Sequence, residues 1–303
     1  MHPQVIGIVN ITEDSFSDGG KFLASDAAIV HAEKLLNDGA DIVDLGPAAS
    51  NPDALGVSAE EEMDRIDPVL TALTARNASI SIDSFLQATQ RFAIGRGAAF
   101  LNDTQGFPDP AFYPELASAS CKLIVMHAVH GRGRAKRLDA PADGVWDAIL
   151  SFFDKRICAL LSAGVAADRI IVDPGMGWFL SDRPAASLSV LGSLYRLKSA
   201  FDLPVLVSVS RKSFLRRIVQ KEVSEMGPAS LAAELCAATA GADYIRTHDV
   251  AALKDGLRVM AAIAAATNSV DAWSPTAHEG IRAACRPNCG ENFPGQPQPT
   301  GRG

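Results

Sequence analysis

Residues 38–45, Asp-Gly-Ala-Asp-Ile-Val-Asp-Leu, contain the local pattern that decides the fold. A glycine follows a stretch of helical period, a short β-branched run comes next, and an aspartate stands near the end of that run. The same order returns in residues 96–103 (RGAAFLND) and 240–248 (AGADYIRTH). Gly39, Gly97 and Gly241 suit the left-handed conformation that often ends a helix. The three copies therefore predict helices that lead directly into strands.

Around these copies, short apolar runs alternate with longer stretches of helical period. The short runs predict strands at residues 5–9, 41–45, 79–82, 99–102, 122–126, 169–172, 204–208 and 243–246. The longer stretches predict helices at residues 27–38, 59–75, 87–96, 145–163, 185–200, 228–240 and 251–266. This alternation is typical of α/β proteins with a parallel sheet. Eight strand–helix units favour a closed (β/α)₈ TIM barrel over the alternative, an open doubly wound sheet.

The barrel pattern stops near residue 267, and the chain changes character there. Residues 268–303 are rich in Pro, Gly, Asn and Ala and show no apolar periodicity. A segment of this composition does not bury enough apolar surface to order itself. We expect a single barrel domain over residues 1–267 and a disordered or loosely docked extension over residues 268–303.

Composition limits the classes of function that the chain could have. Of its 303 residues 48% are hydrophobic and 21% are charged, and the formal net charge is −7. These values support a large core and argue against a general nucleic-acid-binding protein, which normally carries a basic face. The sequence shows neither a signal peptide nor the roughly 20 apolar residues in a row that a membrane-spanning helix needs. We expect a cytoplasmic protein without nucleic-acid or membrane partners, with Cys121, Cys158 and Cys236 as reduced core residues.

Polar side chains follow the predicted strands, at the end of a barrel where functional residues belong. One aspartate there is more often a turn or helix-cap residue, but repetition at equivalent positions is hard to assign to packing. Carboxylates and an amide could read the N–H donors of a heterocycle and stabilise positive charge. Cations after the last two strands could hold a phosphate. The first set is Asp44, Asp83, Asn102 and Asp173, and the second is Arg211, Lys212, Arg246 and His248.

Seven segments of the chain, in this order and spacing, resemble the dihydropteroate synthases. They are GIVNITEDSFSDGG (7–20), SIDSF (81–85), LNDTQGF (101–107), IVMH (124–127), IVDPGMGW (171–178), LVSVSRKSF (206–214) and IRTHDV (245–250). The resemblance covers residues 5–266. It implies an enzyme, a transferase, that condenses 6-hydroxymethyl-7,8-dihydropterin pyrophosphate with 4-aminobenzoate in folate biosynthesis. The products would be 7,8-dihydropteroate and pyrophosphate, the cofactor Mg²⁺ and the assembly a homodimer.

The resemblance also implies roles for individual residues. The implied pterin-binding residues are Asp83, Asn102, Met126, Asp173 and Lys212, among which Asp83, Asp173 and Lys212 are the implied catalytic residues. The implied pyrophosphate-binding residues are Asn10, which would also bind the metal, Arg246 and His248. The residues implied at the 4-aminobenzoate side, where sulfonamide drugs compete, are Ser50, Phe179, Ser210 and Arg211.

Several positions depart from the pattern of that family. After the second strand the family usually has Gly-Gly-Glu-Ser-Thr-Arg-Pro-Gly, but here Ser50 replaces the threonine and Asn51 replaces the arginine. After the sixth strand a Phe, a small residue and a Lys are replaced by Trp178, Phe179 and Leu180. These departures resemble the mobile, sulfonamide-insensitive (Sul-type) branch. We expect Phe179 to exclude sulfonamides by its bulk while 4-aminobenzoate still enters.

Two other functions remain as alternatives. Methyltetrahydrofolate corrinoid methyltransferases share the Asp/Asn pterin set, but they have no need for the Ser-Arg-Lys-Ser segment at residues 210–213. A catalytically silent pterin-binding paralogue is expected to lose loop or anion-site residues, and Asn51 gives this reading some support. Against it, Asn10, Lys212, Arg246 and His248 are all present.

Overall fold

The computed structural model describes residues 2–11, 21–49, 56–131, 135, 137–140 and 142–270. The chain divides into two compact units, Met1–Arg258 and Val259–Gly303. All described strands belong to the first unit. Of the second unit, only the last part of helix α10 (Val250–Val270) is described. The predicted extension therefore lies outside the described residues from position 271 onward.

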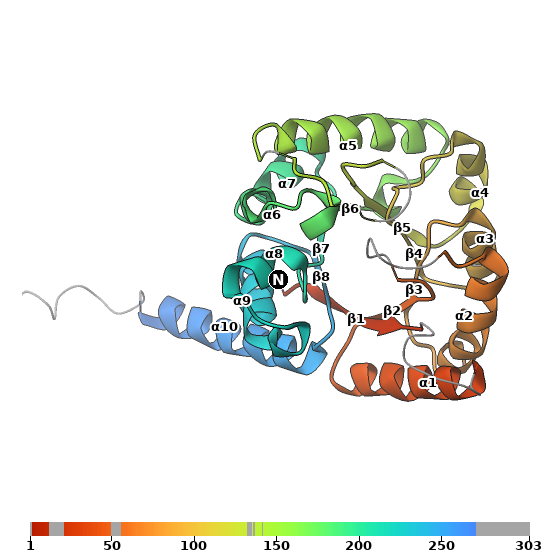
Figure 1. Cartoon of the computed structure of the whole chain (residues 1–303), viewed down its shortest axis with the longest axis horizontal. Helices are drawn as coiled ribbons and strands as arrows, with labels where there is room; N and C mark the ends of the chain where they lie inside the picture. The colour runs from red at the N-terminus through yellow and green to blue at the C-terminus, as the bar shows by residue number, and fades with distance from the viewer. Residues whose placement is uncertain are drawn as a thin grey trace, which may run out of the picture. The chain divides into compact units, whose positions relative to one another are not determined.

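The first unit is a parallel barrel whose strands line the centre of Figure 1. Neighbouring strands pair in the order β6-β5-β4-β3-β2-β1-β8-β7. An isolated parallel bridge between Val172 and Val205 joins the two ends of this order, so the sheet closes on itself. The predicted (β/α)₈ barrel is confirmed, and every strand begins and ends within two residues of its prediction. The strands are β1 (Gln4–Asn10), β2 (Ile42–Gly46), β3 (Ile80–Asp83), β4 (Phe100–Asp103), β5 (Lys122–Met126), β6 (Ile170–Asp173), β7 (Leu206–Val207) and β8 (Tyr244–Thr247).

The helices of the first unit surround the barrel, and most helix bounds follow the predicted ones. The predicted helix 185–200 is two helices, separated by residues 192–194. Its apolar period continues across the break because Leu191, Leu194 and Leu197 are all buried, so periodicity alone could not reveal it. Helix α1 begins six residues before its predicted start, α10 ends four residues after its predicted end, and the short α4 and α8 match none of the predicted ranges. The helices are α1 (Lys21–Asn37), α2 (Ala59–Thr74), α3 (Gln87–Gly95), α4 (Tyr113–Ser118), α5 (Val145–Ser162), α6 (Pro184–Leu191), α7 (Tyr195–Phe201), α8 (Ser213–Val219), α9 (Gly227–Thr239) and α10.

The glycines of the quoted pattern adopt the expected conformation. Gly39, Gly97 and Gly241 have φ angles of +100°, +79° and +92°. Each follows a helix and precedes a strand, so the chain reverses there at little steric cost. The local pattern that predicted the fold thus also reverses the chain between three of the helices and the strands that follow them.

Two apolar layers form the core of the barrel unit. A large cluster lies between the strands and the helices, and a smaller one fills the inside of the barrel. The smaller cluster contains inward-facing residues from seven strands, including Phe100 and Tyr244, whose rings meet edge to face at 6.3 Å between centroids. The members of this inner cluster are Ile6, Ile42, Phe100, Ile124, Ile171, Leu206 and Tyr244. They close the barrel from below, so a ligand has to bind above them.

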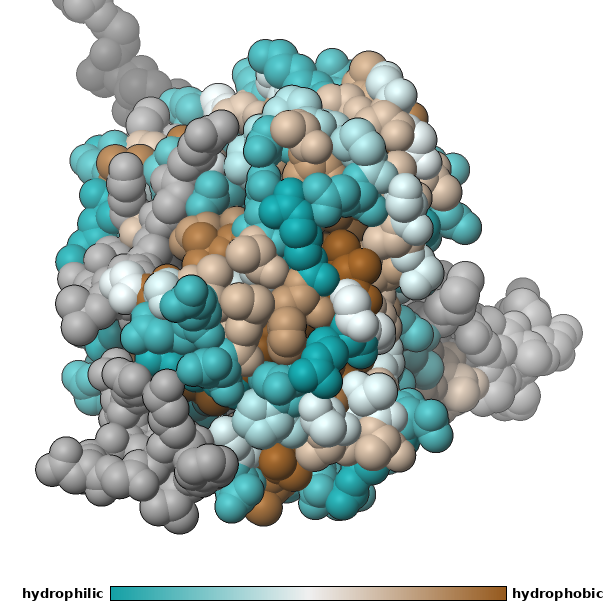
Figure 2. Space-filling view, turned by 90° about the vertical axis from the view of Figure 1, so that its right-hand side faces the viewer, coloured by the Kyte–Doolittle hydropathy of each residue, from teal (hydrophilic) through white to brown (hydrophobic). Residues whose placement is uncertain are grey.

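The outer surface is a mosaic. On the face that carries α2, α3 and α4, hydrophobic residues lie in patches among hydrophilic ones (Figure 2). Among the described residues, none of the helices has the length and apolar character that crossing a membrane requires. The cysteine prediction was partly wrong. All three cysteines are free and Cys121 is buried, but Cys158 and Cys236 are exposed because they face away from the barrel on their helices.

Candidate active site

The alternation of side chains along the strands builds a polar layer directly above the apolar inner cluster. Each inward-facing apolar residue is followed two positions later by another inward-facing residue, because side chains on a strand alternate between its two faces. At this second position most strands carry a polar side chain. The residues of the layer are Asp44, Asn102, Met126, Asp173, Ser208 and Arg246, with Asn10 and Asp83 at the ends of β1 and β3. Seven of these eight residues, all except Ser208, were candidate site residues in the sequence, and strand geometry brings them together here.

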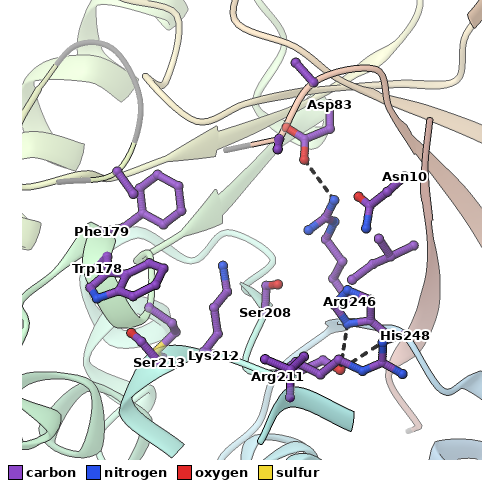
Figure 3. A pocket seen from close by; sticks show the side chains of 17 residues that line it. Asn10, Asp83, Trp178, Phe179, Ser208, Arg211, Lys212, Ser213, Arg246 and His248 are labelled. Carbon is purple, nitrogen blue, oxygen red and sulfur yellow. Dashed lines mark hydrogen bonds and ion pairs between the residues drawn. The ribbon is translucent and has the colours of Figure 1, made fainter. Parts of the chain in front are cut away.

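Arg246 lies at the centre of this layer and holds two carboxylates. Its Nε donates to Asp44 Oδ2 at 2.6 Å. Its Nη2 donates to Asp83 Oδ2 at 2.8 Å, and Figure 3 shows this second contact. Asn102 reaches the same Asp44 oxygen at 3.5 Å, while its own Oδ1 is buried and makes no hydrogen bond to any described residue. Burial raises the pKa of Asp83 to about 7, although Arg246 acts to lower it. The sequence did not reveal this contact between the cationic and acidic sets.

Asp173 ends β6 and is held by the turn that follows it. The N–H of Gly175 donates to Asp173 Oδ1 at 2.8 Å. Gly175 has a φ of +74°, and a Cβ there would lie 2.4 Å from the carbonyl oxygen of His127, so only glycine fits. Burial raises the pKa of Asp173 to about 6. His127 is buried with its Nδ1 3.2 Å from the Pro174 oxygen, as expected of a structural histidine.

Lys212 and Phe179 form one wall of the cavity. Lys212 immediately precedes α8, and its Nζ lies 5.1 Å from the centroid of the Phe179 ring. Figure 3 shows the Lys212 side chain between the aromatic pair Trp178 and Phe179 on one side and Arg246 on the other. Burial and the nearby Arg246 lower the pKa of Lys212 to about 8, whereas Asp173 and Asp83 act to raise it. Lys212 thus keeps a proton at neutral pH, and the charges of both carboxylates act on it.

Ser210, Arg211 and His248 form the opposite, cationic rim, from the loops after β7 and β8. The Ser210 hydroxyl lies 3.0 Å from His248 Nδ1 and accepts the backbone N–H of His248 at 3.3 Å. Burial, followed by Arg211, Arg246 and Lys212, lowers the pKa of His248 to about 3, so the ligand-free side chain is a neutral imidazole. Arg211 is exposed and has a left-handed backbone, with a φ of +56°.

The wall and the rim enclose a cavity of about 450 Å³. Eight of the predicted site residues line it: Asn10, Asp83, Phe179, Ser210, Arg211, Lys212, Arg246 and His248. The predicted pterin-binding residues Asn102, Met126 and Asp173 are buried in the layer described above and do not line this cavity. Ser50 and Asn51 lie outside the described residues, as does most of the first loop.

Sequence reasoning missed several residues at this end of the barrel. Ala48, Ala49, Met176 and Ser208 line the cavity. Glu234 of α9 was also missed: it is 2% exposed, and burial raises its pKa to about 7. A signal for Glu234 was present in the sequence. It is a charged residue within the buried stripe of α9, which consists of Ser230, Ala233, Glu234 and Ala237.

Comparisons with known proteins agree with this geometry. The family described as "Pterin binding enzyme" matches residues 6–248. The chain is similar to dihydropteroate synthase type-2 of Escherichia coli, with 56% identity over 259 residues that cover 86% of this chain and 95% of the relative. It is 54% identical to dihydropteroate synthase type-1 of Pseudomonas aeruginosa over 246 residues, which cover 80% of this chain and 88% of the relative.

Among solved structures, the fold is similar to the Xanthomonas albilineans dihydropteroate synthase with 4-aminobenzoic acid. The TM-score is 0.79 at 35% sequence identity, and the match covers 87% of this chain and 94% of the other. The same enzyme in complex with 7,8-dihydropteroate matches with a TM-score of 0.75 at 34% identity, over the same shares of the two chains. With a barrel closed below by an apolar cluster and lined above by acidic and cationic side chains, this chain belongs to the dihydropteroate synthases, within the family of pterin-binding enzymes.

Proposed function

We propose that this protein is a dihydropteroate synthase, which condenses 6-hydroxymethyl-7,8-dihydropterin pyrophosphate with 4-aminobenzoate to give 7,8-dihydropteroate and pyrophosphate. One observation carries the proposal. A single mouth of the barrel brings carboxylates and an amide next to Lys212, Arg246 and His248. A nitrogen-rich ring and an anionic leaving group need these two kinds of partner side by side.

The pterin end of the substrate fits the acidic part of the layer. Carboxylate oxygens of Asp83 and Asp173 accept hydrogen bonds from the amino and ring N–H groups, and the unpaired Oδ1 of Asn102 offers a third acceptor. The bond between the pterin methylene carbon and the pyrophosphate oxygen breaks and leaves a cation on the ring. The buried carboxylates stabilise this cation, since charge interactions strengthen where water is excluded. The amine nitrogen of 4-aminobenzoate then bonds to the methylene carbon and loses a proton.

The leaving pyrophosphate fits the cationic part of the site. Arg246 would exchange part of its contact with Asp44 and Asp83 for phosphate oxygens, and Lys212 and His248 line the same cavity. Asn10, at the end of β1, supplies a neutral oxygen ligand to this cavity. Mg²⁺ commonly takes one or two protein oxygens and completes its shell with water and substrate phosphates, so Asn10 fits a magnesium ligand. When bound, Mg²⁺ would supply positive charge to the departing pyrophosphate.

We base the proposal of sulfonamide resistance on Phe179, which lies at the 4-aminobenzoate side of the proposed site. Phe179 is 4% exposed and packs in a cluster with Met126, Ala128 and Ala135, so its ring has little freedom to move aside. A sulfonamide carries a larger group than the carboxylate of 4-aminobenzoate. A fixed aromatic wall therefore excludes the drug and admits the substrate.

Purified protein should be assayed with both substrates and Mg²⁺ across a sulfamethoxazole titration. We expect turnover with release of pyrophosphate that persists at drug concentrations that stop an ordinary synthase. Turnover that the drug readily blocks would leave the synthase and remove the resistance. No pyrophosphate release would favour a silent pterin-binding protein instead.

A variant tests the role of Phe179 separately. Phe179→Gly should lower the sulfonamide inhibition constant by about 10- to 100-fold, since a steric contact of this kind is worth a few kcal/mol. Phe179→Leu should show a smaller change in the same direction. An unchanged inhibition constant in a folded Phe179→Gly protein would contradict the steric explanation. We further propose that the protein is a homodimer, which analytical sedimentation can test. We also propose that it is cytoplasmic, which cell fractionation can test.

A further inference from the structure

The wall of the cavity at Phe179 is made of two separate segments of the chain. One is the loop after β6, which carries Trp178 and Phe179, and the other is the start of α8, with Lys212 and Ser213. The segments approach closely, since a Cβ at Gly177 would lie 3.0 Å from Ser213 Oγ. Lys212 Nζ lies 5.1 Å from the centroid of the Phe179 ring (Figure 3). The separation of the two segments therefore limits the size of a ligand that lies against Phe179.

A second cavity, of about 380 Å³, lies behind this wall. Trp178 and Ser213 line both cavities, so they form the partition between the two. Asp182 and Arg217 line the second cavity and not the first. Residues of the second cavity can thus hold the partition from behind without contact to a ligand in the first.

The Asp182 carboxylate connects the two segments of the wall. Trp178 Nε1 donates to Asp182 Oδ1 at 3.3 Å, and Arg217 Nη2 donates to Asp182 Oδ2 at 2.5 Å. Arg217 lies on α8, one helical turn after Ser213. Each carboxylate oxygen therefore holds one segment, and loss of the carboxylate removes both contacts at once.

The backbone around Asp182 is held independently of the Asp182 side chain. The N–H of Asp182 donates to the Leu138 oxygen at 2.7 Å, and the Ser181 hydroxyl donates to the Ala140 oxygen at 2.6 Å. Asp182 thus presents its carboxylate from a fixed position. Substitution of the side chain alone leaves these hydrogen bonds in place.

We propose that Asp182 is a positioning residue for sulfonamide discrimination: by holding Trp178 and Arg217 it keeps the loop after β6 against α8 and limits the space between Phe179 and Lys212. The inference rests on the proposed function for its effect on drug binding, whereas the contacts belong to the ligand-free protein. Without the carboxylate the two segments separate more readily, and a ligand larger than 4-aminobenzoate gains room. The smaller substrate gains little.

Asp139 offers a matched control in the neighbouring loop. Its carboxylate receives two N–H groups of Arg183, which directly follows Asp182 in the chain. The two side chains of this pair are 69% and 54% exposed. Among the described residues, Asp139 forms no hydrogen bond or ion pair with Trp178 or α8. Asp139→Ala therefore removes an aspartate–arginine pair from the same region without releasing the wall.

The first readout is the hydrogen exchange of the Trp178 indole N–H in the ligand-free protein, by proton–nitrogen NMR. Trp178→Phe identifies the signal. Asp182→Ala should speed this exchange about tenfold, because the indole loses its hydrogen bond to a charged acceptor. Asp182→Asn keeps an acceptor oxygen and Asp139→Ala keeps the Asp182 carboxylate, so both should exchange like wild type. Equal exchange in Asp182→Ala and wild type would overturn the proposal.

The second readout is the sulfonamide inhibition constant, measured together with the KM for 4-aminobenzoate. Asp182→Ala should lower the inhibition constant about 5- to 10-fold, less than Phe179→Gly because the aromatic ring is still present, and should change the KM less than twofold. Asp182→Asn, which loses the charge that faces Arg217, should fall between Asp182→Ala and wild type. An inhibition constant that is unchanged in Asp182→Ala, or that falls equally in Asp139→Ala, would also overturn the proposal.

Arg217→Gln removes the ion pair from the side of α8 and decides the question if Asp182→Ala does not fold. The inhibition constant should fall in this variant too, and an unchanged value would count against the proposal. A wild type that sulfonamides readily block would refute the proposed resistance, and a wild type without turnover would refute the proposed function. In both cases the indole exchange still shows whether Asp182 holds the wall.

Discussion

The acidic and cationic halves of the site are built in different ways. Asp44, Asn102 and Asp173 lie within strands or at their last residue, so barrel hydrogen bonds hold their backbone directly. Ser210 and Arg211 follow β7, which is only two residues long (Leu206–Val207). The Ser230 hydroxyl of α9 instead accepts the N–H of Arg211 at 3.0 Å. The acidic half, which is fixed by strands, suits the pterin ring that stays bound. The cationic half, which is built from loops, suits the pyrophosphate that leaves.

Arg246 is the point where the two halves meet, and its removal should have the largest effect. Arg246→Ala leaves Asp44 and Asp83 buried without their cation. The free energy of unfolding at pH 7.5 should fall by about 3–5 kcal/mol, and synthase activity should be lost. Denaturant titration measures the first and pyrophosphate release the second. A loss of stability below about 1 kcal/mol would show that Arg246 serves the ligand alone.

Removal of Glu62, a buried carboxylate of α2 that lies behind the acidic half, should affect folding more than binding. Glu62→Ala leaves the hydroxyls of Ser84 and Thr89 buried without their acceptor. We expect a loss of about 2–3 kcal/mol in the free energy of unfolding, with the dissociation constant of pyrophosphate changed less than twofold. A large change in pyrophosphate affinity would mean that Glu62 supports the anion site as well as the fold.

The pH dependence of Asp173 should have opposite signs for stability and for binding. Burial raises its folded-state pKa to about 6, above the value of 3.8 expected when unfolded. The folded protein thus binds this proton more tightly, so the stability that Asp173 contributes is present at low pH and is lost as the pH rises through about 6. Between pH 8 and pH 5, wild type should gain about 1–2 kcal/mol relative to Asp173→Asn. Pterin affinity of wild type should fall over the same range, because the protonated carboxyl loses acceptor capacity.

Denaturant unfolding of the wild type and Asp173→Asn at several pH values gives the stability difference, and fluorescence titration with a pterin gives the affinity. Parallel unfolding curves at all pH values would show that Asp173 keeps an ordinary pKa in the folded protein.

Loss of an exposed ion pair at the outer edge of the cationic half should have the smallest effect on the free energy of unfolding. Arg216 and Glu222 approach to 3.5 Å, with 38% and 80% of their side chains exposed. Arg216→Ala should change the free energy of unfolding by less than about 0.5 kcal/mol. Thermal unfolding at low and high salt measures this. A larger, salt-insensitive loss would mean that packing of the Arg216 stem, rather than its charge, stabilises α8.

The sequence predicted most residues of the acidic half, but it did not show which side chains contact the loops of the cationic half. Asp83, Asn102 and Asp173 could be placed at strand ends because strand direction and side-chain alternation are local properties. The division of helix 185–200 could not be seen, since both parts bury leucines with continuous period. Glu234 stood on the buried stripe of α9, but only the fold shows that Ser210 and Thr247 lie close enough to affect its pKa.

The sequence by itself determined the repeated strand–helix unit, the end of each strand at which polar residues gather, and the family to which the chain belongs. These depend on periods of a few residues and on motifs within single segments. Only the tertiary structure decided which charges meet. Arg246 reaches Asp44 and Asp83 across 202 and 163 positions of the chain. That contact exists because closure of the barrel brings β8 beside β1, and no local pattern contains that geometry.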